Sequence, residues 1–182
     1  MSNLLLQPDL SGDGPIHDVT PASAGWSHVG FGLHDLAAGT SVGSDGTADE
    51  ICLVLLSGSV RIIAGDLDTG MVQGRASVFD KVAPHAVYVP MKTAWRVEAG
   101  SDSELAVCRA PGTEGKLPPR LIGSQNMPLE TRGTGSNVRH VCNILPETEP
   151  ADSLLVVEVI TPAGNWSSYP PHKHDTDNLP EE

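Results

Sequence analysis

The sequence is short of basic residues, and this shortage narrows the range of possible partners. Lys and Arg total 11 of 182 residues against 23 Asp and Glu, which gives a net charge of −12 at pH 7, and the basic residues do not cluster. Because nucleic acids and anionic membranes are bound through concentrated positive charge, we expect neither as a partner. A small anionic substrate would need a local arginine, lysine or metal to overcome the acidic field.

Cysteines and long apolar runs are also scarce. The three cysteines, Cys52, Cys108 and Cys142, form no C-x-x-C pair, and an odd count does not suit a disulfide framework. We expect buried free thiols in a reducing compartment. No apolar run approaches membrane-spanning length, and the leucines at positions 4–6 are too few for a signal sequence. The sequence therefore predicts a cytoplasmic protein.

A helical apolar pattern is missing as well, and short strands take its place. Gly and Pro account for 19 and 15 positions, and no long window keeps apolar residues three and four apart. Residues 51–56 and 60–64 predict a hairpin around a Ser-Gly-Ser turn. Residues 86–89, 95–99 and 105–108 predict further strands, so we expect an all-β barrel or sandwich in the first part of the chain.

The second part of the chain follows a stretch rich in Gly, Pro and polar residues, 116–136, which predicts a connector. Beyond it, the apolar run at 154–160 predicts a buried strand. Residues 137–182 are roughly half of what an eight-stranded barrel needs. We therefore expect an incomplete second unit, whose strands must pair with the first unit, with another subunit or, as we favour, with residues beyond position 182.

A His-Lys-His sequence near the end of the chain is the strongest chemical signal. Side chains alternate on an extended segment, so His172 and His174 point the same way while Lys173 points to the other side. Two imidazoles can then share one divalent metal ion, and Zn, Mn, Fe and Ni all suit such ligands. Glu181 or Glu182 could supply a further ligand after the turn-like Asn-Leu-Pro.

The other histidines have weaker claims to a ligand role. His17, His28, His34 and His85 have no partner at ligand spacing, and we expect ordinary surface or hydrogen-bonded residues. His140 stays open as a candidate because it is nearer to the His-Lys-His sequence.

The region around these histidines resembles a known family. Residues 164–175 read Gly-Asn-Trp-Ser-Ser-Tyr-Pro-Pro-His-Lys-His-Asp, and residues 178–182 read Asn-Leu-Pro-Glu-Glu. Both runs resemble the signature of the 5-deoxy-glucuronate isomerase family of bacterial inositol catabolism, and the similarity extends upstream through residues 143–146 and 153–159. That family resembles the bicupins, which have two small β-barrels per subunit with the metal in the second. The resemblance therefore implies an all-β bicupin whose second barrel is incomplete in this chain.

The resemblance also divides the chain. It implies a degenerate N-terminal cupin barrel over residues 1–115, a connector over 116–136, and the start of a metal-binding C-terminal cupin barrel over 137–182. The first barrel lacks a His-x-His pair, and Trp95 is near the position where a metal-binding histidine would stand. We expect that barrel to be structural. In the family, the remaining glutamate and histidine ligands come from residues beyond Glu182.

The activity that the resemblance implies is aldose–ketose isomerisation of 5-deoxy-glucuronate to 5-dehydro-2-deoxy-gluconate, with one divalent metal ion (Zn, Mn, Fe or Ni) held by His172 and His174. Arg139 matches a family arginine and can grip the substrate carboxylate with two hydrogen bonds, although a structural ion pair is an equal alternative. Trp166 and Tyr169 are expected to pack around the substrate. The general base is not identified, and a homo-oligomer is compatible with the unpaired strands.

Two other functions fit the same residues. A metal-dependent cupin dioxygenase would use the two histidines with iron, and oxygen uptake would distinguish it. A non-catalytic sugar-binding or assembly fragment would lack the remaining ligands and hold little metal, whereas the isomerase should hold about one tightly bound ion per subunit.

Overall fold

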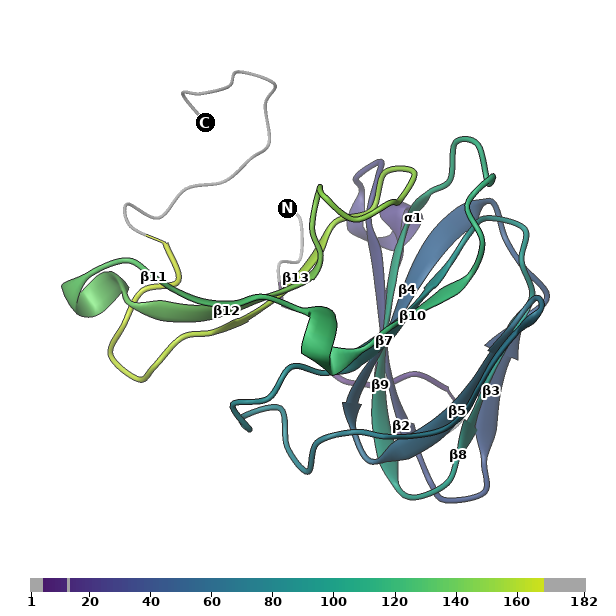
Figure 1. Cartoon of the computed structure of the whole chain (residues 1–182), viewed down its shortest axis with the longest axis horizontal. Coiled ribbons are helices and arrows are strands. Elements are labelled where there is room, and N and C mark those ends of the chain that lie inside the picture. Colours follow the sequence, from purple (N-terminus) through teal and green to yellow (C-terminus); the bar gives the residue numbers. More distant parts are fainter. Residues whose placement is uncertain (1–4, 13, 169–182) are drawn as a thin grey trace.

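The computed structural model describes residues 5–12 and 14–168, and over these residues the regular secondary structure is almost entirely antiparallel β-sheet (Figure 1). This confirms the all-β prediction. Within the same residues, no helix is long and apolar enough to cross a membrane. The elements in chain order are β1 (His17–Val19), α1 (Pro21–Ala24), β2 (Gly30–Leu36), β3 (Ser41–Ser44), β4 (Asp49–Ser57), β5 (Ser59–Ala64), β6 (Leu67–Gln73), β7 (His85–Val89), β8 (Trp95–Ala99), β9 (Ser103–Pro111), β10 (Arg120–Ile122), η1 (Ser124–Asn126), β11 (Leu129–Arg132), η2 (Gly135–Asn137), β12 (Arg139–Leu145) and β13 (Val156–Ile160).

Two sheets form the first unit. A six-stranded sheet in the order β1-β2-β9-β4-β7-β10 packs against a four-stranded sheet in the order β3-β8-β5-β6. Side chains alternate along the strands: on β8, Trp95, Val97 and Ala99 are buried while Arg96 and Glu98 face outward. This alternation places an apolar core between the sheets. Its buried members are Leu36, Ile51, Leu53, Leu55, Val60, Ile62, Ala64, Val87, Val89, Trp95, Val97, Ala99, Leu105 and Val107.

The predicted hairpin around the Ser-Gly-Ser turn was wrong. β4 pairs with β7 and β9, whereas β5 pairs with β6 and β8, so the two strands belong to different sheets. Gly58 turns the corner between them with a φ of 88°, and a Cβ there would lie 2.3 Å from the Asp102 carbonyl oxygen. Only glycine accepts this conformation and this close approach. A register shift between Leu55 and Ser57 accompanies the bend.

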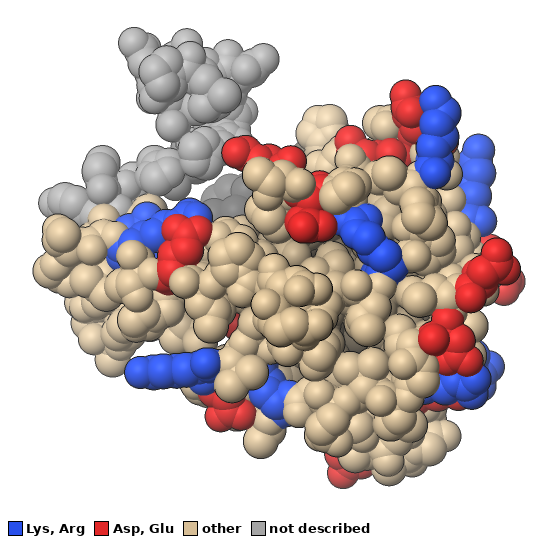
Figure 2. Space-filling model, viewed as in Figure 1, with Lys and Arg blue, Asp and Glu red and all other residues tan. Residues whose placement is uncertain are grey.

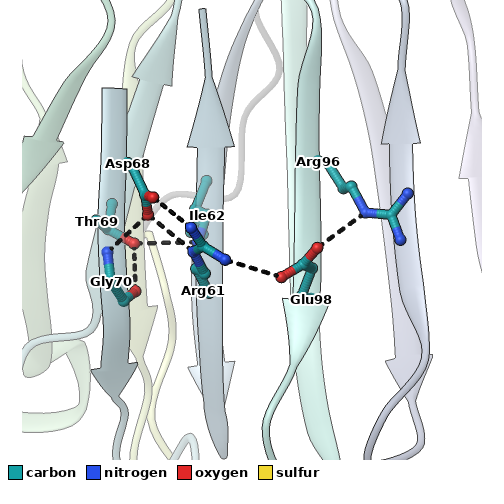
Figure 3. A network of polar contacts seen from close by, with 7 residues as sticks. All are labelled: Arg61, Ile62, Asp68, Thr69, Gly70, Arg96 and Glu98. Carbon is teal, nitrogen blue, oxygen red and sulfur yellow. Dashed lines mark hydrogen bonds and ion pairs between the residues drawn. The ribbon is translucent and has the colours of Figure 1, made fainter. Parts of the chain in front are cut away.

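The outer face of the four-stranded sheet carries a chain of ion pairs (Figure 3). Arg61 on β5 donates from Nε to Asp68 on β6 at 2.9 Å, and its Nη1 lies 3.6 Å from Glu98 Oε2 on β8. Arg96 continues the chain, with Nε 3.2 Å from Glu98 Oε1. Because these side chains are 38–60% exposed, solvent screens each pair and its contribution to stability is small. The network therefore marks a solvated face.

The three-stranded sheet β11-β12-β13 forms the second described unit and packs on the first. One of its faces, here called the proximal face, lies against the outer face of the six-stranded sheet. There Cys142, Ile144 and Val156 join Cys52 and Tyr88 in a second buried apolar cluster. The opposite side is called the distal face. The first unit thus covers the part of the proximal face that carries these side chains, while Leu129, Thr131 and His140 on the same face are exposed.

The prediction of a buried strand over residues 154–160 is right for one side only. β13 begins at Val156, and its side chains alternate between the two faces. On the distal face, Val157 and Val159 are 52% and 41% exposed. The apolar run is therefore a strand with one covered face, which composition alone does not distinguish from a strand buried on both sides.

The stretch predicted as a connector, 116–136, joins the two units and also adds a strand to each. β10 pairs with β7 in the six-stranded sheet, and β11 pairs with β12 in the three-stranded sheet. All four side chains of β11 are exposed, so no apolar alternation indicates this strand. The domain boundaries given above stay a prediction.

Glu50 on β4 is a fully buried carboxylate that ties the second unit to the first. Its Oε1 accepts hydrogen bonds from the backbone N–H groups of Ser153 and Leu154, both at 2.5 Å. Its Oε2 accepts from the Asp152 backbone N–H and from the Tyr88 hydroxyl, both at 2.8 Å. Burial, and then the hydrogen bond to Glu50, raise the pKa of Tyr88 well above its ordinary value. These donors offset the cost of burying the carboxylate.

A reciprocal contact runs from the second unit to the first. Asp152 Oδ2 accepts hydrogen bonds from the backbone N–H groups of Thr113, Glu114 and Gly115 at 2.9–3.0 Å. These bonds, foremost the one from Gly115, lower the pKa of the Asp152 carboxyl. Each unit therefore places a carboxylate among backbone donors of the other.

An ion pair provides a third tie between the units. Arg75, which follows β6 and has a side chain only 2% exposed, forms a two-point contact with Glu158 on β13, with Nη1 2.8 Å from Oε1 and Nη2 bonded to Oε2. Its Nε donates to the Leu56 carbonyl oxygen at 2.9 Å, and Nη1 also donates to the Val82 carbonyl oxygen at 3.1 Å. The guanidinium is therefore well supplied with acceptors on both sides of the junction.

Arg75→Met should lower the free energy of unfolding by about 2–3 kcal/mol, because methionine fills the space of the arginine stem but leaves the Glu158 carboxylate unpaired. Glu158 is 20% exposed, so water reaches it and the loss stays below the roughly 3–5 kcal/mol of a fully buried pair. Urea unfolding measures the change. Arg61→Met is the control, since that guanidinium is 42% exposed and its removal should change the midpoint little. Equal stability of the two variants would show that the Arg75 pair does not tie the units.

Candidate functional site

The predicted metal ligands His172 and His174 and the predicted substrate residue Tyr169 lie outside the described residues, as do Glu181 and Glu182. Within residues 5–12 and 14–168, no three His, Cys, Asp or Glu side chains gather closely enough to hold a metal ion. A metal centre in this protein would therefore draw on ligands outside that part of the chain.

The interior of the first unit offers no alternative site. Trp95, which is near the position of a cupin ligand in the family resemblance, points into the core and is 7% exposed. The other side chains of this core cluster are aliphatic. Metal ions need nitrogen, oxygen or sulfur ligands, so this cluster can coordinate none.

The distal face of the three-stranded sheet gathers the described candidate residues. Arg132 on β11 is paired with Arg139 on β12, and Asn143 on β12 is paired with Val157 on β13. Paired residues of antiparallel strands project to the same side. The face is a mixed polar and aliphatic surface on which, of the members named below, Val141 alone is buried. Its members are Glu130, Arg132, Arg139, Val141, Asn143, Val157 and Val159.

Arg139, the predicted carboxylate-binding residue, begins β12. Its Nη1 donates to the Asn137 carbonyl oxygen at 3.1 Å. Among the described residues it takes part in no ion pair, so the alternative of a structural ion pair finds no partner there. The guanidinium therefore keeps donors that a ligand can use.

Trp166, the second described candidate, is held beside the start of β12 by its backbone. Its N–H donates to the Ser136 carbonyl oxygen at 2.8 Å, and the side-chain amide of the preceding Asn165 donates to the Val138 carbonyl oxygen at 2.8 Å. Trp166 is 50% exposed. The structure thus brings Arg139 and Trp166 to the same end of the sheet, although they are well separated in the sequence.

Three further residues of the distal face were missed by the sequence-based prediction. Arg132 binds Glu130 through two contacts, Nε to Oε2 at 3.1 Å and Nη2 to Oε1 at 3.0 Å, and Asn143 Nδ2 also donates to Glu130. The hydrogen bond from Arg132, followed by that from Asn143, lowers the pKa of the Glu130 carboxyl. Figure 2 shows adjoining basic and acidic side chains at this end of the molecule. The Glu-x-Arg spacing would have indicated a shared face once β11 was known to be a strand.

His140, left open as a possible ligand, lies on the proximal face. Its Nδ1 is 3.1 Å from Thr131 Oγ1, and it borders a groove of about 240 Å³ between the sheet and residues 79–82. Arg139 projects to the other side, so the two do not face a common ligand. Among the remaining histidines, His85 accepts a hydrogen bond from the Ser124 N–H at 3.4 Å, as expected of a hydrogen-bonded residue.

The three cysteines are free, as predicted. Cys52 and Cys108 are paired across β4 and β9, and Cys142 lies at the junction of the two units. Burial raises the pKa of all three thiols, to about 11 for Cys108 and Cys142. They therefore stay protonated at neutral pH and are poor nucleophiles.

Comparison with known proteins adds to this geometry. The model of the KduI/IolB family matches residues 4–182. A 5-deoxy-glucuronate isomerase of Geobacillus kaustophilus (strain HTA426) is 51% identical over 170 residues, which are 93% of this chain and 61% of that protein. The 5-deoxy-glucuronate isomerase of Bacillus subtilis (strain 168) is 42% identical over 187 residues, covering 100% of this chain and 69% of that protein. The crystal structure of an IolB-like protein from Salmonella typhimurium LT2 matches with a TM-score of 0.91 and 45% identity, over 98% of this chain and 67% of that one. The chain thus spans about three fifths of the length of the first of these relatives.

Proposed function

The chain belongs to the KduI/IolB family, and we propose on this basis that the full-length protein isomerises 5-deoxy-glucuronate to 5-dehydro-2-deoxy-gluconate in myo-inositol catabolism. The observation that carries the proposal is the 51% identity to a named 5-deoxy-glucuronate isomerase over 93% of this chain. The reaction converts an aldehyde into a ketone on the neighbouring carbon. A cytoplasmic location and a homo-oligomer complete the proposal.

The proposed architecture is a bicupin. Residues 1–115 would be a degenerate cupin barrel, 116–136 a connector and 137–182 the start of a metal-binding barrel. Two features support the last part: β11 and β13 each pair with a single described strand, and the distal face between them is partly exposed. Further strands paired to these edges would enclose the distal face within a second barrel.

One divalent metal ion, Zn, Mn, Fe or Ni, belongs to the proposal, with His172 and His174 as two of its ligands. The described part of the chain holds no competing cluster of ligands, and two imidazoles on one side of an extended segment suit any of these ions. When bound, the ion would supply a Lewis acid for the reacting carbonyl group.

The substrate carboxylate is proposed to bind Arg139, whose guanidinium has donors left over, while Trp166 and Tyr169 enclose the sugar carbons. A cation at this place would counter the net charge of −12, which otherwise repels a uronate. Holding the carboxylate fixes the position of the aldehyde at the other end of the substrate, as proton transfer between neighbouring carbons requires.

The full-length protein should convert 5-deoxy-glucuronate to its ketose equally well in air and under nitrogen, and should hold about one divalent ion per subunit. NMR of the product and elemental analysis of the purified protein provide the two measurements. Removal of the ion with a chelator should stop turnover, and adding the ion back should restore turnover. Oxygen consumption with bound ferrous ion would favour the dioxygenase instead, and little metal with no turnover would favour a non-catalytic role.

A further inference from the structure

We propose that Arg132 and Arg139 form a two-arginine carboxylate site on the distal face, with Glu130 and Asn143 holding Arg132 in place. The proposal rests on the uronate substrate proposed above and adds Arg132 and its two partners to the same site. Five observations support it: the register, the charge balance, the unused donors, the tight turn that follows β11, and the aliphatic side chains beside the cluster.

Register starts the two arginine side chains from neighbouring positions, from which Arg132 reaches toward Glu130 and Asn143 and Arg139 reaches toward the Asn137 carbonyl oxygen. Arg132 and Arg139 are direct partners across β11 and β12, so their side chains leave the sheet on the same side and from neighbouring positions. Like charges directly opposite each other destabilise a strand pair. Such an arrangement calls for a compensating negative charge.

The charge balance of the cluster is incomplete. Two arginines and one carboxylate, Glu130, give a net charge of +1 in a chain whose net charge is −12. Hydrogen bonds from Arg132 and Asn143 lower the pKa of Glu130, so this single negative charge is already present at neutral pH. One further carboxylate would neutralise the cluster, and a uronate carries one.

The donors needed for that carboxylate remain available. Arg132 uses Nε and Nη2 for Glu130, and Arg139 uses Nη1 for the Asn137 carbonyl oxygen. Among the described residues, Arg132 Nη1 and Arg139 Nη2 make no hydrogen bond. Each guanidinium therefore keeps a donor for a ligand carboxylate, and its use does not require the contact between Arg132 and Glu130 to break.

The turn after β11 packs closely against the Arg139 side chain. Gly133 has a φ of 84°, and a Cβ at this position would lie 2.0 Å from the Asn137 carbonyl oxygen and 2.9 Å from Arg139 Nη1. The backbone thus closes on the Arg139 guanidinium more tightly than any other residue type would permit. Donors held in place before the ligand arrives bind it at a lower entropic cost.

The aliphatic part of the distal face fits the rest of the substrate class. Val157 and Val159 are 52% and 41% exposed beside the polar cluster. A deoxy sugar acid has one carbon without a hydroxyl group, and aliphatic side chains favour such a carbon over a hydroxylated one.

The test compares Arg132→Met with Arg61→Met in the full-length protein. Arg61 is a matched control because it also forms an ion pair with a carboxylate and is similarly exposed, but lies on the first unit. Arg132→Met should raise KM for 5-deoxy-glucuronate by about 10- to 100-fold with a smaller change in kcat, whereas Arg61→Met should change neither. The neutral analogue 5-deoxy-glucose, which has a hydroxymethyl group in place of the carboxylate, should keep its KM in both variants. The KM of Arg132→Lys for 5-deoxy-glucuronate should fall between those of Arg132→Met and the unaltered protein, because lysine keeps the positive charge but lacks the planar guanidinium donors.

Two kinetic results would overturn the carboxylate site: a KM for 5-deoxy-glucuronate in Arg132→Met that equals the control value, or a KM that rises equally for the neutral analogue. Equilibrium titration with glucuronate and glucose separates this proposal from the isomerase proposal. Loss of the preference for glucuronate in Arg132→Met would support the site even without turnover. An unchanged preference, or no preference in the unaltered protein, would overturn the site while leaving the isomerase proposal standing.

Discussion

Glu50→Ala is expected to lower the free energy of unfolding by about 3–5 kcal/mol, a large part of the roughly 5–15 kcal/mol that holds an ordinary domain together. The substitution removes the acceptor of three consecutive backbone N–H groups, those of Asp152, Ser153 and Leu154, and of the Tyr88 hydroxyl. A buried donor left without a partner costs about 1–3 kcal/mol, and alanine also leaves a cavity that lets water recover only part of this cost.

Urea unfolding followed by circular dichroism measures the loss, with Glu98→Ala as the control on the solvated face of the four-stranded sheet. Glu50→Gln keeps the side-chain shape but turns one acceptor into a donor that faces other donors. Its free energy of unfolding should therefore fall between those of Glu50→Ala and the unaltered protein. If Glu50→Ala were as stable as Glu98→Ala, the buried carboxylate would not be what joins the two units.

His172→Ala in the full-length protein is expected to abolish both metal retention and isomerase turnover. Loss of a group that merely orients a metal ligand already costs about 10- to 100-fold in affinity or activity, and loss of the ligand itself should cost more. The proposed reaction depends on the ion as the Lewis acid for the carbonyl, so turnover should fall with metal content. Elemental analysis and the isomerisation assay on the same preparation give the two measurements.

His28→Ala is the matched control, because His28 is exposed on the first unit and has no proposed ligand role. Its metal content and turnover should equal those of the unaltered protein. Normal metal content and turnover in His172→Ala would remove His172 from the metal site and, with it, the chemical basis for placing the site at the His-Lys-His sequence.

Five strands of the first unit, β4, β5, β7, β8 and β9, could be predicted from short apolar runs or, as on β8, from alternating apolar residues. What could not be predicted was which strands pair. The Ser-Gly-Ser turn reads as a hairpin, yet Gly58 faces Asp102, far away in the sequence, and sends the chain into the other sheet. In the same way, β11 buries none of its four side chains, and its strand structure depends on pairing with β12. Pairing is a long-range property, and local composition does not contain it.

The candidate site divides along similar lines. Arg139 and Trp166 could be named from the family resemblance, and the structure brings them to one end of the sheet. Arg132 could not be named, because its significance lies in the register that sets it opposite Arg139. His140 was retained as a possible ligand because it is near the His-Lys-His sequence. Adjacent residues of a strand face opposite ways, however, so His140 lies on the proximal face and Arg139 on the distal face. Whether Tyr169, His172 and His174 join these residues stays a prediction.

The exchange of carboxylates between the units has a mechanical consequence. Glu50 reaches into the backbone of the second unit while Asp152 reaches into that of the first, so neither can rotate about the junction without releasing hydrogen bonds on both sides at once. These hydrogen bonds should therefore restrict rotation of the two units at the junction. Conformational change near the distal face should therefore come from the loops around it and not from rotation of one unit against the other.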